Sequence, residues 1–359
     1  MRQIQNALPI MLTLLIAFAS AVTDEFWFAI EGAFAGGALQ IQNNTADTGT
    51  NGFFDYSSDI LVSDIPQTEG NKSSQTASTE QSKDASGSIE ASSSGAALGK
   101  IVEQFISPYS AKYSYNNVYL KNTSGLSIDL KSELNKKLGI KIKKTSEPEV
   151  LIVHTHATEC YMYENRDYYT SSDASRTTDN SKNVTRIGDI IESKLKNEGI
   201  GVIHDKTQHD YPSYTGSYSR AEVTIKEYLK KYPSIKIVID VHRDSIALND
   251  TDRVRPVAEV NGKNAAQVML VMGSESGTVK NFPNWKENFR LAARLQQTME
   301  VMYPGLARPM VLASKLYNQN LTTGSILLEV GTESNLLSEA EYSAELVGNA
   351  LASLLNTMG

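Results

Sequence analysis

Cysteine is almost absent from this chain of 359 residues, because Cys160 is the only one. A single thiol excludes an intrachain disulfide and leaves the cellular compartment undecided. An excess of basic residues is also missing, since the formal net charge is -7. This balance argues against nucleic acid as a partner. Hydrophobic residues make up 40% of the chain, which is enough for a globular core.

Long apolar runs are scarce, and the clearest one stands near the N-terminus. Residues 7–22 follow Arg2 and end before Asp24, and a further apolar stretch covers residues 26–39. The run 7–22 is shorter than the roughly 20 residues of a spanning helix, so a short membrane anchor and a cleaved signal peptide both fit. We favour the anchor and interpret residues 1–39 as a membrane anchor or signal region.

The next segment lacks the residues that build a core. Residues 40–99 are rich in Ser, Thr, Asn, Gln and Gly, and Ile89 is the only large apolar residue between positions 67 and 96. Such a composition cannot bury enough surface to fold, which predicts a disordered tether. The folded body is expected to cover residues 100–359.

In that body, short runs rich in Val, Ile and Leu alternate with helical patterns. This alternation predicts an α/β fold with a mixed, mostly parallel sheet flanked by helices. The expected strands are 150–153, 201–204, 235–240, 267–272 and 325–330. The expected helices cover about 183–198, from 219 to before 233, about 285–303, and from 338 to the C-terminal region.

Two of these helices begin with a sequence typical of a capping box, in which a Ser or Thr precedes a Glu by three residues. The pairs are Ser219 with Glu222 and Ser338 with Glu341. Both serines are therefore predicted as N-caps.

Polar residues gather where three of the expected strands end. Strand 150–153 leads into residues 154–159, strand 235–240 leads into His242, and strand 325–328 leads into Glu329. The carboxyl ends of parallel strands share one edge, where ligands bind in open α/β sheets. These side chains are therefore expected to meet.

Their chemistry predicts a catalytic zinc (Zn2+). Two imidazoles and a carboxylate can hold this ion and leave a position for water, whose pKa then falls to about 7. His156 and Glu159 are spaced so that one loop can present both, and His242 completes the ligand set. Glu329 is then the expected general base, which takes a proton from water and passes it to the leaving amine.

Several assignments stay open. His154 competes with His156 as a ligand, because the register at the strand end is not fixed by the sequence. Asp240 is an alternative ligand or a hydrogen-bond acceptor behind a ligand imidazole, and Asp244 is a second acceptor of that kind. Arg243 is expected to bind a substrate carboxylate. The two other histidines, at positions 204 and 209, are expected to be structural or to face substrate.

The motifs resemble those of the stage II sporulation protein P family of cell-wall hydrolases. Three blocks carry the resemblance: VLIVHTHATECY at 150–161, IVIDVHRDS at 237–245 and ILLEVGTESNLLSEA at 326–340. The stretch at 177–191 fits between them, and the likeness extends over roughly 115–357. The anchor and tether agree with the layout of that family.

The resemblance implies a zinc-dependent N-acetylmuramoyl-L-alanine amidase with endopeptidase activity, which acts on peptidoglycan during forespore engulfment. It implies a place outside the mother-cell membrane, in the intermembrane space, with stage II sporulation proteins D and M as partners. The implied fold is similar to that of wall amidases and zinc carboxypeptidases. The residues from His156 to Glu159 resemble the His-x-x-Glu loop of those carboxypeptidases, which favours His156 as the ligand. In distant wall amidases the glutamate ligand comes later, where residues 177–183 of this chain contain no glutamate. Glu159 is therefore a prediction that departs from those amidases.

Two other functions fit the same residues. A metallocarboxypeptidase would release C-terminal amino acids and use Arg243 to bind the terminal carboxylate. A catalytically inactive wall-binding scaffold would keep the fold and bind no metal. The sequence does not decide the oligomeric state, the bond that is cut or the cleavage of the N-terminal segment.

Overall fold

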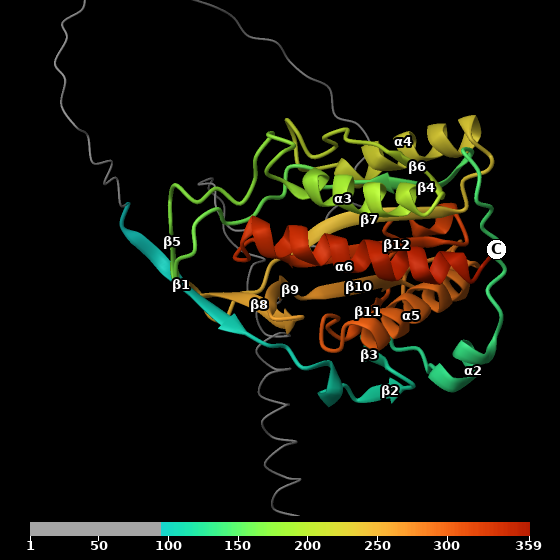
Figure 1. Ribbon diagram of the computed structural model, residues 1–359, viewed down its shortest axis with the longest axis horizontal. Helices are drawn as coiled ribbons and strands as arrows, with labels where there is room; N and C mark the ends of the chain where they lie inside the picture. The colour runs from blue at the N-terminus through green and yellow to red at the C-terminus, as the bar shows by residue number, and fades with distance from the viewer. Residues whose placement is uncertain (1–94) are drawn as a thin grey trace, which may run out of the picture. The chain divides into compact units, whose positions relative to one another are not determined.

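A computed structural model describes residues 95–359, whose arrangement is shown in Figure 1. The expected anchor region, residues 1–39, and most of the expected tether, residues 40–99, lie outside the described residues. The first described element, β1 (Ala97–Gln104), begins close to residue 100. Within residues 95–359, no helix combines the length and apolar character that crossing a membrane requires.

Eight strands form the main sheet of the described domain. In chain order they are β2 (Tyr113–Tyr115), β3 (Val118–Asn122), β4 (Pro148–Val153), β6 (Gly201–His204), β7 (Ile237–Asp244), β10 (Val268–Gly273), β11 (Met310–Ala313) and β12 (Ser325–Thr332). Their order across the sheet is β2-β3-β11-β10-β12-β7-β4-β6. Neighbours are parallel except for β2 with β3 and β10 with β12. The predicted mixed, mostly parallel sheet is confirmed.

The five expected strands all occur, but three of them are longer than predicted, and β4 begins two residues earlier, at Pro148. β7 continues to Asp244 and β12 to Thr332, because the two strands go on pairing with each other past the end of their apolar runs. In this pairing His242 lies opposite Glu329. Both residues therefore lie within strands. The sequence had placed His242 just after the strand 235–240 and Glu329 near the end of the strand 325–330.

A second sheet of four strands has the order β5-β1-β8-β9 and was not predicted. Its further strands are β5 (Tyr168–Thr170), β8 (Arg253–Val260) and β9 (Lys263–Ala266). Asn261 and Gly262 form the two-residue turn between β8 and β9, both with positive φ (52° and 75°). An Asn-Gly pair suits this turn, since both residues tolerate the left-handed conformation.

The four expected helices all occur, with differences at two of their starts, whereas α2 was not predicted. They are α2 (Leu130–Asn135), α3 (Val184–Asn197), α4 (Ser217–Lys231), α5 (Trp285–Met302) and α6 (Leu337–Asn356), with the short 3-10 turns η1 (Pro108–Ser110) and η2 (Gln319–Leu321). The prediction of Ser219 as N-cap is wrong, because Gly216 precedes the first turn of α4 with a φ of 82°. The prediction of Ser338 is also wrong, because α6 begins one residue earlier and the carboxylate of Glu339 accepts the N–H of Leu336 at 3.1 Å.

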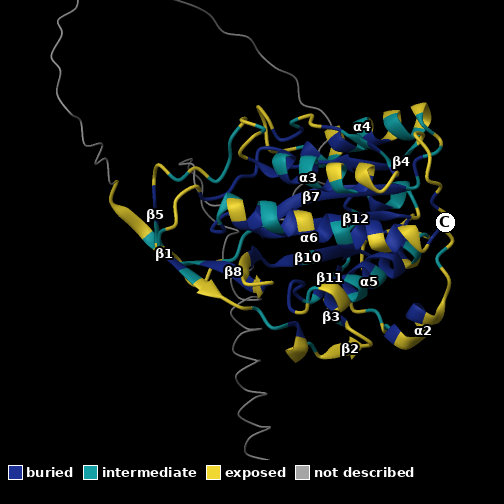
Figure 2. Ribbon diagram, in the orientation of Figure 1, coloured by how far each residue is buried: buried dark blue, intermediate teal, exposed yellow. Residues whose placement is uncertain are grey.

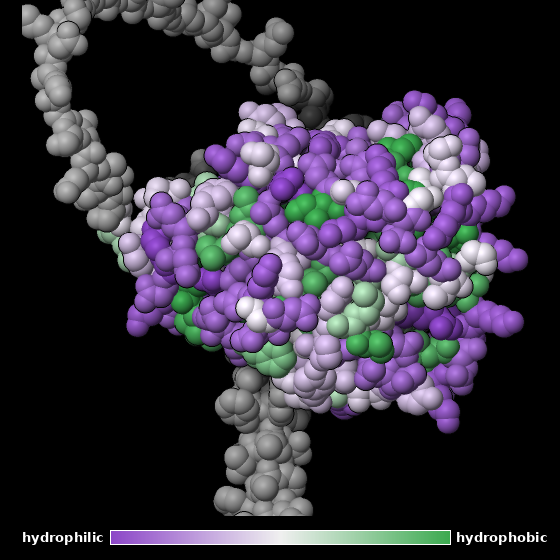
Figure 3. Space-filling view, in the orientation of Figure 1, coloured by the Kyte–Doolittle hydropathy of each residue, from purple (hydrophilic) through white to green (hydrophobic). Residues whose placement is uncertain are grey.

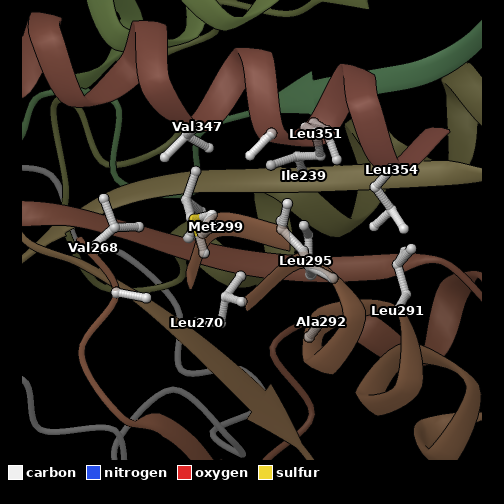
Figure 4. Packing of buried hydrophobic residues seen from close by; sticks show 14 of the residues in the cluster. Ile239, Val268, Leu270, Leu291, Ala292, Leu295, Met299, Val347, Leu351 and Leu354 are labelled. Carbon is white, nitrogen blue, oxygen red and sulfur yellow. The ribbon is translucent and has the colours of Figure 1, made fainter. Parts of the chain in front are cut away.

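Three helices, α3, α5 and α6, cover one face of the main sheet, whose central strands β7, β10 and β12 are buried beneath them (Figures 1 and 2). Figure 4 shows side chains of α5 and α6 packed against those of the sheet, among them Leu295 and Leu351 near Ile239 and Leu270. Truncating a buried leucine of this kind to alanine typically costs about 2–5 kcal/mol. The outer surface over these helices is mainly hydrophilic (Figure 3), as expected for amphipathic helices.

Helix α4 packs on the other face, over the β4 side of the sheet. Ile225 of α4 belongs to a cluster with Leu151, Val153 and Val238 of the neighbouring strands. The loop after β4 and the start of α4 consequently lie near each other at the carboxyl ends of β4 and β7.

Candidate metal centre

The carboxyl ends of β4 and β7 bring three potential ligands together. His156 and Glu159 come from the loop that follows β4, and His242 comes from β7. Glu159 Oε1 lies 3.4 Å from His156 Nδ1, and Glu159 Oε2 lies 3.4 Å from His242 Nδ1. One ligand atom from each residue lies within 4.8 Å of the others. All three side chains are at most 1% exposed.

The electrostatic surroundings favour the ionised form of Glu159 in this cluster. Burial alone would raise the pKa of Glu159, but contacts with His156 and His242 outweigh it and hold that pKa well below its usual value. The backbone N–H of Arg243 also donates to Glu159 Oε2 at 3.2 Å, which orients the carboxylate. A buried negative charge therefore faces two imidazoles.

The donor set fits a divalent cation such as zinc. Glu159 Oε1 and His242 Nδ1 are buried and have no hydrogen-bond partner among the described residues. Leaving buried polar atoms without a hydrogen bond is costly, and a bound cation would satisfy both. Two imidazoles and one carboxylate form a set typical of catalytic zinc, with room for a further ligand.

Asp240 lies behind His242, away from Glu159. Its Oδ1 is 2.9 Å from His242 Nε2, while its two oxygens accept hydrogen bonds from the N–H and the hydroxyl of Thr155 at 2.8 and 2.6 Å. Burial alone would raise the pKa of Asp240, but His242 and Thr155 lower it to about 2. The same carboxylates, Asp240 and Glu159, overcome the effect of burial on His242 and raise its pKa well above the usual value. This is the geometry of a carboxylate that orients a ligand imidazole.

Asp244 does not take the role expected for it. Its Oδ2 accepts a hydrogen bond from Arg308 Nη1 at 2.8 Å. Its partner is thus an arginine from the loop before β11, and the expectation that Asp244 supports a ligand imidazole is corrected.

His154 points away from the cluster, so the structure separates the two candidate histidines. Its Nδ1 lies 2.8 Å from the carbonyl oxygen of Val241, and its Nε2 lies 2.8 Å from His204 Nε2. Burial, and then the nearby His204, lower the pKa of His154 to about 3. The chain leaves the strand after Val153, and this turn directs His156 alone toward Glu159 and His242.

Arg243 is buried, which corrects the expectation that it binds substrate. Its side chain is 4% exposed, and it donates to the carbonyl oxygens of Cys160 and Ser175 at 3.3 and 2.8 Å. Strand alternation sends Arg243 to the face opposite His242. There the loop after β4 covers it, so Arg243 holds that loop in place.

Glu329 lies in register with His242 on the neighbouring strand and is 1% exposed. Burial raises its pKa to about 8, and the carboxylates of Asp244 and Glu159 act in the same direction against the opposing effects of His242 and Arg308. Its Oε2 has no hydrogen-bond partner among residues 95–359. A buried carboxyl group with a raised pKa is suited to accept and release a proton.

The remaining histidines have structural partners. His209 Nδ1 lies 2.9 Å from the carbonyl oxygen of His154, and its Nε2 lies 2.9 Å from the hydroxyl of Thr224. His204 forms a second group with Asp189 and Glu192, whose ligand atoms also lie within 4.8 Å of one another. This second group is on the α3 side of β4.

Sequence reasoning missed the residues that line the cluster from the loops. Arg176 Nη2 lies 3.5 Å from Glu159 Oε1, and the rings of Tyr214 and Tyr218 lie 4.7 and 5.5 Å from that of His156. These residues belong to irregular segments or a helix start, where no periodic pattern marks them. Arg176 directly precedes the motif at 177–191, and this position was the only available signal.

The fold and the cluster together define a mixed α/β domain with a candidate metal centre of the kind that hydrolytic enzymes use. The sequence matches the family described as "Stage II sporulation protein P (SpoIIP)" over residues 44–352. Because this match covers most of the chain, the chain belongs to the stage II sporulation protein P family. The resemblance seen in the sequence is thereby confirmed.

One curated relative is Stage II sporulation protein P of Bacillus subtilis (strain 168). It is 32% identical over 220 residues, which make up 58% of this chain and 50% of the relative. The match thus spans half the length of that protein.

Solved structures of wall amidases show a weaker likeness. The amidase AmiC2 of Nostoc punctiforme is 10% identical with a TM-score of 0.35, and the match covers 59% of this chain and 97% of that one. The CwlD amidase from Clostridioides difficile, in complex with the GerS lipoprotein, is 12% identical with a TM-score of 0.34 and coverages of 58% and 97%. Scores of this size assign no function.

Proposed function

We propose that this chain is a cell-wall hydrolase of sporulation, and specifically a zinc-dependent N-acetylmuramoyl-L-alanine amidase with endopeptidase activity in forespore engulfment. The observation that carries this proposal is the buried cluster of His156, Glu159 and His242 beside Glu329. Membership of the stage II sporulation protein P family supports the wall substrate and the sporulation role. The second bond specificity rests on the family, since one metal and one base can serve either amide.

In this proposal His156, Glu159 and His242 hold the zinc ion, and Asp240 orients His242. When bound, zinc supplies a Lewis acid that polarises the scissile carbonyl and makes water more acidic. The network around Thr155 and Asp240 fixes the ligand side chains before substrate arrives, which lowers the cost of organising the site.

Glu329 would carry the proton during hydrolysis. It accepts a proton from the attacking water and gives it to the nitrogen of the leaving amine as the carbon–nitrogen bond breaks. The water oxygen ends in the new carboxylic acid, and Glu329 returns to its starting state. Its burial keeps competing water away from the carboxyl group.

The burial of Arg243 weakens the metallocarboxypeptidase alternative, because that reading relied on an accessible guanidinium at this position. The inactive-scaffold alternative predicts a chain that takes up no metal. Zinc uptake therefore separates it from the amidase proposal.

The sequence and the family support a proposal for the location and the partners. We propose that the apolar residues 7–22 hold the chain at the membrane, with the domain on the extracytoplasmic, mother-cell side of the intermembrane space. Stage II sporulation proteins D and M are the proposed protein partners, and peptidoglycan is the proposed substrate.

The test is hydrolysis of purified peptidoglycan by the purified full chain, with mass spectrometry of the released fragments. We expect free peptide stems with an N-terminal alanine, loss of release after chelation, and its return with added zinc. Glu329→Ala should retain zinc and lose release. Release of stems by Glu329→Ala at the wild-type level would contradict the proposal. Release that is insensitive to chelation would also contradict it.

A further inference from the structure

A solvent-accessible guanidinium lies next to the candidate metal centre and has no role in the function proposed above. The side chain of Arg176 is 35% exposed, in contrast to the buried Arg243 on the other side of the loop. The backbone of Arg176 pairs with that of Glu159 in an isolated antiparallel bridge. This pairing holds Arg176 at a constant position relative to a candidate ligand.

Neighbouring side chains fix the orientation of this guanidinium. Arg176 Nη1 donates to Asp210 Oδ2 at 2.6 Å and to the hydroxyl of Thr158 at 3.3 Å. Asp210 is itself held by the N–H and hydroxyl of Thr158. The ring of Tyr214 lies against the group, with its centroid 4.8 Å from Arg176 Cζ. A planar group held in this way has little freedom left to lose when it binds a ligand.

One edge of the guanidinium stays available. The Nη1 hydrogens are used by Asp210 and Thr158, and Nη2 makes one contact with Glu159 Oε1 at 3.5 Å. The edge formed by Nε and the second Nη2 hydrogen has no acceptor among the described residues. Two parallel N–H donors on one edge match the two oxygens of a carboxylate.

We propose that Arg176 is a specificity residue that binds a free carboxylate on the peptide of the substrate, close to the bond that is cut. This inference rests on the proposed function, because it names the chemistry recognised beside that centre. In a muramoyl peptide the fitting group is the α-carboxylate of the glutamate that follows the first alanine. Arg176 thus takes the role that the sequence had suggested for Arg243.

A purely structural role is the alternative, since Arg176 also links Asp210 to the loop that carries Glu159. The two roles differ in what they do to related ligands. Loss of a structural contact weakens all ligands alike, whereas loss of a carboxylate receptor affects only the ligand with the free carboxylate. The ratio of two affinities therefore separates them.

The experiment measures binding by calorimetry to the full chain supplied with zinc, in a Glu329→Gln background that prevents turnover. The two ligands are N-acetylmuramoyl-L-alanyl-γ-D-glutamyl-L-lysine amide and the same compound with the glutamate α-carboxylate converted to a carboxamide. We expect the carboxylate form to bind about tenfold or more tightly, as for a charged hydrogen-bonded pair.

Arg176→Gln should reduce this preference to about onefold, mainly by weakening the carboxylate ligand, and Arg176→Lys should restore only part of it. The matched control is Lys182→Gln, which removes one positive charge from an exposed side chain of the same segment. It should keep the preference of the parent.

Three results would overturn the inference: equal binding of both ligands by the parent, an unchanged preference in Arg176→Gln, or an equal loss for both ligands in that variant. The proposed function is judged separately, by release of stems from peptidoglycan by the wild-type chain. A chain that releases nothing but shows the preference and loses it in Arg176→Gln would contradict the amidase proposal and support the role of Arg176.

Discussion

Two groups of histidine and carboxylate side chains meet near the end of β4, and they differ in what neutralises them. In the group of Asp189, Glu192 and His204, each carboxylate already has a lysine: Lys206 lies 2.5 Å from Asp189, and Lys196 lies 2.6 Å from Glu192.

Glu159, in the other group, is fully buried, and no lysine of the described residues pairs with it. The partners of Glu159 are instead the imidazoles of His156 and His242, each at 3.4 Å, with Arg176 Nη2 at 3.5 Å. The same residue types therefore suggest a metal site where the carboxylate is buried against two imidazoles, and not where each carboxylate is paired with a lysine.

The largest expected difference between the groups concerns their glutamates. Glu159→Gln should lower zinc affinity by at least about 100-fold, because an anionic ligand is lost, whereas Glu192→Gln should leave it unchanged. Competition with a fluorescent chelator measures both affinities. If both variants lost zinc affinity equally, the claim that only the group with Glu159 binds zinc would be contradicted.

A smaller difference is expected between the aspartates that contact histidines in each group. Asp240→Asn should weaken zinc binding by about 10–100-fold, because the amide orients His242 less well, while Asp189→Asn should have no effect on zinc. The same competition assay applies. Unaltered zinc affinity in Asp240→Asn would show that Asp240 does not support His242 as a zinc ligand.

The last expected effect concerns stability and not zinc binding, through the packing of α3 on the second group. A Cβ at Gly188 would lie 2.5 Å from His204 Nε2 and 2.8 Å from His154 Nε2. Gly188→Ala should therefore lower the free energy of unfolding by about 1–3 kcal/mol through overpacking, measured by urea denaturation. Gly139→Ala, where a Cβ meets nothing within 4 Å, is the control. Equal stability of both variants would contradict the close packing.

Much of the fold could be predicted from the sequence because its strands are continuous runs of Val, Ile and Leu, buried on both faces. The same pattern located the shared edge that carries His242 and Glu329. The extra lengths of β7 and β12 could not be predicted, since they depend on pairing between residues far apart in the chain. The start of α4 after Gly216 depends on local backbone geometry, and the start of α6 at Leu337 depends on Glu339.

The site could be predicted in part. Ligand chemistry and spacing pointed to Glu159 and His242, but the choice between His154 and His156 depends on a turn after Val153 that has no periodic signal. Arg243 was expected to bind substrate beside the metal because it follows His242 in the sequence. Consecutive residues of a strand point to opposite faces, however, and both residues lie within β7. Arg176 reaches the site through a bridge between two loops.

Zinc content after exposure to zinc, measured by plasma mass spectrometry on the purified full chain, tests the central claim most directly. The wild type is compared with the variants His154→Ala, His156→Ala, His204→Ala and His242→Ala. We predict about one zinc per chain in the wild type, loss of zinc in His156→Ala and His242→Ala, and retention in His154→Ala and His204→Ala. A folded wild-type chain that takes up no zinc, or a loss with His154→Ala but not with His156→Ala, would contradict the account.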